Sequence, residues 1–244
     1  MRLHRLTAVL AAAVLIWTGV PTAHAIDVTP MVVHITPTGT GAGYRLSVKN
    51  TDDQPVTVEL QAFRMEVDEN GARTLTEEEN DIAIFPPQSI IPPNREQVVQ
   101  VRYVGAPDAG PRMYLVRVGQ LPITFSSESG NPSSAAVQVA FNVNTHVLMA
   151  PSGARPALRV VSTRTAENGD ILISAENQGA GFASLREARY TLTAADGRTV
   201  EIPPASVVLG QVSTLPGGAS RNIRIPAALA PGIGADVTAS IVLT

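Results

Sequence analysis

Residues 135–149 read Ala-Ala-Val-Gln-Val-Ala-Phe-Asn-Val-Asn-Thr-His-Val-Leu-Met and are the most informative part of this chain. Apolar side chains at Val137, Val139, Phe141 and Val143 alternate with smaller or polar ones, which predicts a strand with one apolar face. The predicted strand contains no Gly or Pro and is over twice the usual strand length. Two interpretations stay open. It is either an ordinary core strand of a β-sandwich or, where it lies on a sheet edge, a template for pairing with another chain.

The same period-two pattern recurs along the rest of the chain, interrupted by clusters of Gly, Pro, Asp and Asn. Asn168-Gly169 and Asp196-Gly197 stand where hairpin turns are expected. The turn spacing is typical of immunoglobulin-like sandwiches. We therefore predict an all-β chain with two such domains, residues 26–151 and 152–244, and a hinge at 151–156. The predicted strands besides 135–149 cover residues 28–36, 43–49, 55–65, 96–104, 113–121, 157–163, 170–176, 184–193, 199–202, 220–225 and 235–243.

The first 25 residues have the pattern of a secretory signal peptide. A basic start, Met1-Arg2-Leu3-His4-Arg5, precedes an apolar run and the small-x-small ending Ala23-His24-Ala25. The apolar run is too short for a retained membrane span. We expect cleavage after Ala25 and an exported mature chain, residues 26–244, with no membrane insertion.

The composition excludes several classes of protein. The chain has no cysteine, which argues against a small disulfide-stapled scaffold. Its formal net charge of −3 gives no indication of a nucleic-acid partner. The acidic run 76–81 lacks the ligand spacing and turn glycine of a calcium loop, so we interpret it as a solvated loop.

Residues for catalysis are scarce. The predicted mature chain has two histidines, His34 and His146, and contains no phosphate loop, no nucleophile-elbow motif and no His-x-x-His pair. Serines at 126, 127 and 129 have no general base beside them in sequence. We expect no enzymatic activity, no cofactor and no metal site.

Three further segments, taken with residues 135–149, carry a resemblance to a known family. They are IFPPQSIIPPNREQVVQVRY at 84–103, RMYLVRVGQLP at 112–122 and TLPGGASRNIRIP at 214–226. Their order and spacing resemble those of the periplasmic chaperones of pilus assembly. The resemblance covers the whole predicted mature chain. It implies two immunoglobulin-like domains set at an angle.

The resemblance also implies a function, donor-strand complementation. A chaperone of this family binds and caps a pilin-type subunit that lacks its last strand, lends a strand of its own, and delivers the subunit for surface assembly. On that mapping the donor strand of this chain presents Ala135, Val137, Val139, Phe141 and Val143. The implied location is the periplasm, and the implied partners are a pilin-type subunit and an outer-membrane usher.

The chain departs from the family at the site that holds the subunit's terminal carboxylate. The family places an arginine on its first strand and a lysine on the last strand of the first domain. These positions fall near Val32 and on His146. His146, when protonated, would replace one charge, although a plain strand histidine is an equal interpretation. The other candidate anchors are Arg45, Arg102 and Arg117.

Two other functions remain as alternatives. A secreted two-domain immunoglobulin-like binding or adhesion module would present loops to a carbohydrate or a cell surface, with the polar loop 126–134 as its candidate site. A chaperone-like subunit built permanently into a surface structure would share the same fold. The adhesion alternative lacks an aromatic stacking platform in that loop, since the single tryptophan, Trp17, lies in the predicted signal peptide.

Overall fold

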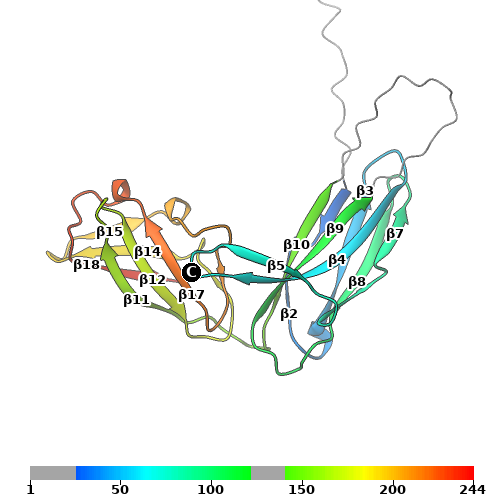
Figure 1. Cartoon of the computed structure of the whole chain (residues 1–244), viewed down its shortest axis with the longest axis horizontal. Coiled ribbons are helices and arrows are strands. Elements are labelled where there is room, and N and C mark those ends of the chain that lie inside the picture. Colours follow the sequence, from blue (N-terminus) through cyan, green and yellow to red (C-terminus); the bar gives the residue numbers. More distant parts are fainter. Residues whose placement is uncertain (1–25, 122–140) are drawn as a thin grey trace, which may run out of the picture.

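A computed structural model describes residues 26–121 and 141–244 of the chain. These residues form two β-sandwiches that lie at an angle to each other (Figure 1). The prediction of an all-β chain with two immunoglobulin-like domains is confirmed. The exact limits proposed for the domains stay a prediction, as does the signal peptide at residues 1–25, which lies outside the described residues.

The first sandwich consists of two sheets. The first sheet has the order β1 (Ile26–Thr29), β3 (Gly43–Asn50), β8 (Glu96–Tyr103) and β6 (Ile82–Phe85). The second has the order β2 (Val32–Ile35), β10 (Asn142–Met149), β9 (Arg112–Leu121), β4 (Val56–Val67) and β5 (Arg73–Glu77), and β7 (Gln88–Ile91) also pairs with β4. A short 3-10 turn, η1 (Thr40–Ala42), precedes β3.

The second sandwich is built from shorter strands in three groups. One sheet has the order β11 (Leu158–Thr165), β12 (Ile171–Asn177) and β17 (Ser220–Ile225), and a small pair joins β13 (Ala183–Ser184) to β16 (Thr214–Leu215). The third group has the order β15 (Thr199–Ile202), β14 (Arg189–Ala194) and β18 (Val237–Val242). The 3-10 turns η2 (Pro204–Ser206) and η3 (Ala227–Leu229) lie between strands. The hairpin turn predicted at Asp196-Gly197 is confirmed, because it connects β14 to β15.

Each sandwich has its own apolar core, produced by the alternation of buried and outward-facing residues. In the first domain, Leu46 and Val48 of β3 and Val116 and Val118 of β9 are completely buried. In the second domain, Ile171 and Ile173 of β12 pack against Ile223 and Ile225 of β17 within a separate cluster. The chain therefore holds two independent cores, which is consistent with the absence of cysteine.

A buried asparagine ends an inner strand in each domain and supports the turn that follows. Asn50, at the end of β3, donates from Nδ2 to the carbonyls of Gln54 and Ile91 at 2.8 and 3.0 Å. Asn177, at the end of β12, donates to Gly181 and Leu215 at 2.9 and 3.0 Å. Both side chains are fully buried, and the bonds to the Ile91, Gly181 and Leu215 carbonyls are buried as well, so these groups are satisfied inside the protein.

The strand predicted at 28–36 is in fact two strands in different sheets. β1 pairs with β3 in the first sheet, whereas β2 pairs with β10 in the second. Pro30 lies between them and has no N–H to donate to a ladder, so the chain leaves one sheet there and enters the other. The prediction of one continuous strand is therefore wrong.

The sequence prediction also missed β5, β6 and β7. β5 contains the first two residues of the acidic run that was interpreted as a loop, Thr76 and Glu77. Both faces of β5 are largely exposed, so no apolar alternation marks it as a strand. At residues 135–149, β10 begins at Asn142, and Ala135, Val137 and Val139 lie outside the described residues, as does the candidate loop 126–134.

Candidate functional site

The edge of β10 is open over half of the strand. On one side β9 pairs with it along its whole length, from Asn142 to Met149. On the other side β2 pairs with it in parallel, and only from His146 to Met149. Among the described residues, no strand pairs with residues 142–145 on that side. Unpaired backbone groups of this kind form a template for an additional strand.

The side chains along this part of β10 divide between the domain core and the outside. Phe141 is 43% exposed, and its carbonyl accepts a hydrogen bond from the Gln120 amide at 2.9 Å. Val143 is half-buried and packs against the first core. Thr145 is buried and donates to the Val116 carbonyl at 3.2 Å. The apolar row therefore passes from solvent into the core near Val143.

Where β2 begins to cover β10, a pocket of about 220 Å³ lies between the two domains. His146 lies in it directly opposite Val32, its register partner on β2. The family resemblance predicts the lysine position on His146 and the arginine position near Val32. The pocket is lined by Val32, Met65, Arg73, Met113, His146, Leu148, Gln211, Val212, Ser213 and Thr214.

One side chain that lines the pocket carries a positive charge that the sequence analysis did not predict. Arg73, the first residue of β5, lines it together with His146, and the lining residues include no carboxylate. Burial and then the positive charge of Arg73 lower the pKa of His146 below its ordinary value of 6.5. The imidazole is therefore neutral at pH 7, and Arg73 carries the positive charge of the pocket.

The other candidate anchors lie elsewhere in the first domain. Arg45 and Arg102 are exposed residues on β3 and β8 of the first sheet, away from β10. Arg117 of β9 donates from Nε to Asn144 Oδ1 at 3.3 Å, and its guanidinium lies 4.3 Å from the ring centroid of Phe63. Of the four candidates, only His146 lines the interdomain pocket.

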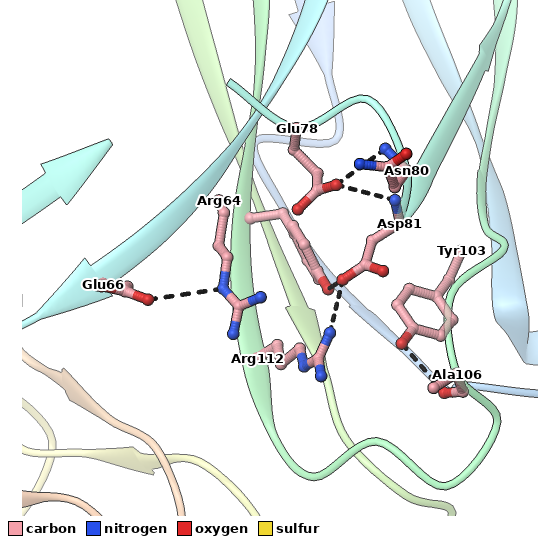
Figure 2. Close-up of polar contacts among 9 residues, drawn as sticks. Arg64, Glu66, Glu78, Asn80, Asp81, Tyr103, Ala106 and Arg112 are labelled. Carbon is pink, nitrogen blue, oxygen red and sulfur yellow. Dashed lines mark hydrogen bonds and ion pairs between the residues drawn. The ribbon is translucent and has the colours of Figure 1, made fainter. Parts of the chain in front are cut away.

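A second polar cluster joins the turn between β5 and β6 to the beginning of β9 (Figure 2). Asp81 Oδ2 accepts hydrogen bonds from Arg112 and from the Tyr114 hydroxyl, both at 2.6 Å. Glu78 Oε1 accepts the backbone amides of Asn80 and Asp81, each at 2.9 Å, and so holds the turn between β5 and β6. Glu78 and Asp81 of this turn therefore have structural partners within the protein.

No group of three or more His, Cys, Asp or Glu side chains able to hold a metal ion occurs in residues 26–121 and 141–244. In the same residues, no helix is long and apolar enough to cross a membrane.

Comparison with family models identifies one match. The model described as pili and flagellar-assembly chaperone, PapD N-terminal domain, matches residues 26–155. This match spans the first domain, with both the open edge of β10 and His146. A comparison with curated proteins found no match.

Several solved chaperone structures resemble this chain in fold. The class 5 fimbriae chaperone CfaA is 10% identical, with a TM-score of 0.58 over 90% of this chain and 100% of its own. The Escherichia coli chaperone DraB is 16% identical, with a TM-score of 0.53 over 84% and 86%. A chain of the Salmonella enterica complex of the SafA pilin with the SafB chaperone is 14% identical, with a TM-score of 0.53 over 85% and 86%.

Proposed function

Because the chain belongs to the family of pili and flagellar-assembly chaperones, we propose that it binds and caps pilin-type subunits by lending them the open edge of β10. The observation that carries this proposal is the difference in pairing on the two sides of β10. β9 pairs with all of the strand. β2 pairs only with His146 to Met149 and leaves residues 142–145 open. An incoming strand can form hydrogen bonds with the unpaired backbone N–H and C=O groups there.

The chemistry of this binding is β-augmentation. Backbone hydrogen bonds supply much of the contact, and alternate side chains fill the groove of a subunit that lacks a strand. In this chain the alternate side chains are those of Ala135, Val137, Val139, Phe141 and Val143. The exposure of Phe141 and the partial burial of Val143 support Phe141 as the innermost side chain that is free to enter the subunit.

We assign the anchoring of a subunit carboxylate to the interdomain pocket. Arg73 supplies a permanent charge there, and His146 supplies a hydrogen-bond donor that gains a charge when it is protonated. Arg45, Arg102 and Arg117 do not line this pocket and are weaker candidates on that ground. The pocket lies where β2 meets the open edge of β10, so an incoming strand that pairs with β10 ends beside it.

The proposed location is the periplasm, reached after removal of the signal peptide at residues 1–25. The partners are a pilin-type subunit and an outer-membrane usher, and the role requires neither catalysis nor a cofactor. The complexes among the structural neighbours support the choice of partner, since one holds a chaperone with the SafA pilin and another a chaperone with a tip adhesin.

The experiment that tests this function is capture of the partner in the periplasm. The tagged full-length chain is expressed together with the pilin-type subunits of its own genome, and the periplasmic fraction is purified. We expect a one-to-one complex with a small β-rich subunit. Recovery of the folded chain alone, with the subunits degraded or aggregated, would contradict the proposed function.

A further inference from the structure

The β4–β5 hairpin extends from the first domain to the second (Figure 1). Its turn, residues 68–72, is called here the hairpin tip. We propose that the hairpin tip is an interdomain latch, which fixes the second domain against the first and keeps the pocket around His146 assembled. This inference goes beyond the proposed function, because it concerns the arrangement of the free chain.

The hairpin tip has a shape that its own residues determine. Asp68 Oδ1 accepts the amides of Asn70 and Ala72 at 2.9 and 2.8 Å, and the Gly71 amide donates to the Asp68 carbonyl at 3.0 Å. Gly71 has φ +79°, a left-handed conformation that glycine adopts without strain. The tip is therefore preorganised and loses little conformational freedom when it docks.

The surface that receives the tip is held by a buried arginine of the second domain. Arg221 is 1% exposed, and its guanidinium donates to the carbonyls of Leu209, Val212 and Thr214. These three carbonyls belong to residues 209–214, the loop before β16 together with the first residue of that strand, and Arg221 thus keeps this loop in a single shape. Burial lowers the pKa of Arg221, and the charge of Asp68 in the hairpin tip opposes that effect.

Backbone hydrogen bonds join the tip to this loop and to β17. The Gly71 carbonyl accepts the amides of Gln211 and Val212 at 3.0 and 3.2 Å, and the Glu69 carbonyl accepts the Asn222 amide at 2.6 Å. These bonds fix the relative position of two main chains. They leave much less freedom than a contact between long side chains, so they suit a latch.

The fit at the centre of the contact requires glycine on both sides. A Cβ on Gly71 would collide with the Leu209 carbonyl and lie 2.7 Å from the Arg221 guanidinium. A Cβ on Gly210 would collide with the Asn70 carbonyl and lie 2.8 Å from Gly71 Cα. A Cβ does not come this close to a non-bonded atom in real structures, so a side chain at either position would push the hairpin tip away from the second domain.

Among the described residues, one small apolar cluster contains side chains from both domains. Met65, Met113 and Leu148 are buried in it, and the second domain adds Phe182 and Val212. Two domains that share so small an apolar interface are expected to move relative to each other. The latch supplies the directional contacts that oppose this motion. Gly71, Gly210 and Arg221 are therefore positioning residues for the pocket.

The test measures the distance between the domains in solution. The chain has no cysteine, so Gln100→Cys on β8 and Ser240→Cys on β18, both exposed, give two unique spin-label sites. Electron–electron double resonance should give one narrow distance distribution for this parent. Gly71→Ala and Gly210→Ala should broaden it, because each forces the hairpin tip off the loop.

Matched controls separate the latch from glycine strain. Gly39 and Gly197 have φ values of +75° and +84°, yet an added Cβ would have nothing within 4 Å. Gly39→Ala and Gly197→Ala carry the same backbone strain and should keep the narrow distribution. Distributions for Gly71→Ala and Gly210→Ala as narrow as the parent's, at the same distance, would overturn the proposal.

A milder pair of variants covers the case in which the glycine variants fail to fold. Gln211→Ala removes the 3.3 Å bond to the Arg73 amide, and Asn222→Ala removes the 3.2 Å bond to Asn70 Oδ1. The double variant should broaden the distribution. It should also shift the NMR signals of His34, whose ring lies 6.3 Å from that of Phe182 across the domain junction. An unchanged distribution with unchanged His34 signals would overturn the latch without any reference to subunit binding.

Discussion

Arg112 and Asp81 form an ion pair with an N–O distance of 2.6 Å (Figure 2). The pair joins the first residue of β9 to the turn before β6. Asp81 has only 15% of its side chain exposed, and it also accepts the hydroxyl of Tyr114. The pair thus ties together elements that are distant in sequence, in a place where water screens it little.

Arg112→Ala should destabilise the first domain. The substitution leaves the Asp81 carboxylate with one partner fewer, and an unsatisfied, largely buried acceptor costs about 1–3 kcal/mol. Urea unfolding followed by circular dichroism measures the loss. Arg189→Ala is the control, because the Arg189–Glu201 pair is 61% and 70% exposed and such pairs contribute about 0–1 kcal/mol. Equal losses in the two variants would contradict the structural role of Asp81.

Asn50→Ala and Asn177→Ala should each destabilise the domain that contains the residue. Each asparagine satisfies buried carbonyls, and each group left without a partner costs on the order of 1–3 kcal/mol. The measurement is again the urea midpoint. Gln178→Ala, at an exposed position beside Asn177, should leave that midpoint unchanged.

Phe141→Arg should abolish subunit binding and leave the free chain folded. Phe141 is 43% exposed in the free protein, so an arginine there stays in water until the subunit groove closes over it. An unpaired buried charge costs several kcal/mol, which lowers affinity by at least about a hundredfold. Titration calorimetry with the purified subunit measures this. Val242→Arg, at a site 55% exposed in the second domain, should bind as the parent does. Unfolding of Phe141→Arg alone would instead place Phe141 in the core of the chaperone.

Arg73→Ala should weaken subunit binding across the whole pH range, whereas His146→Ala should weaken it slightly at pH 7 and more strongly in acid. Arg73 is charged throughout, but the lowered pKa of His146 keeps it neutral at pH 7. A subunit carboxylate raises that pKa on binding, so the His146 contribution grows as pH falls. His146→Lys should bind with less dependence on pH, and Arg45→Ala should match the parent. If Arg73→Ala binds as tightly as the parent, the anchor lies elsewhere.

The stability of the free chain should fall as pH decreases below about 6.5, the ordinary value for histidine. The pKa of His146 is lower in the folded state than in the unfolded state, so the unfolded state binds more protons in the window between the two values. Stability therefore rises with pH through this window and is fully present above it. His146→Gln should reduce this slope. If the free energy of unfolding depends on pH in the same way in parent and variant, the pKa of His146 does not differ between the folded and unfolded states.

Local alternation in the sequence was enough to predict most strands and the two sandwich domains, because a strand with one buried face must alternate. It did not reveal the change of sheet at Pro30, since the pattern around Val28 and Val32 is the same whichever sheet the strand enters. β5 escaped prediction because its side chains are largely exposed on both faces.

At the candidate site, the sequence identified His146 but missed Arg73. The position of His146 follows from its place on the long strand. Arg73 lies on a different hairpin, and only the docking of that hairpin against the second domain brings it to the pocket. Nothing in the residues around Arg73 marks such a tertiary contact. A cation supplied by another element is therefore hard to predict from one sequence.

The short length of β2 also determines the register of anything that pairs with β10. An incoming strand lies on the same side of β10 as β2, so it cannot advance past Thr145, where Val32 already occupies the ladder opposite His146. The start of β2 thus sets the last residue of β10 with which an incoming strand can pair. A shift of one residue would turn every inserted side chain to the opposite face, and this limit prevents that slip. A subunit must therefore have the right number of residues between its carboxyl end and the groove that receives the side chains of this chain. It must also offer a matching apolar surface.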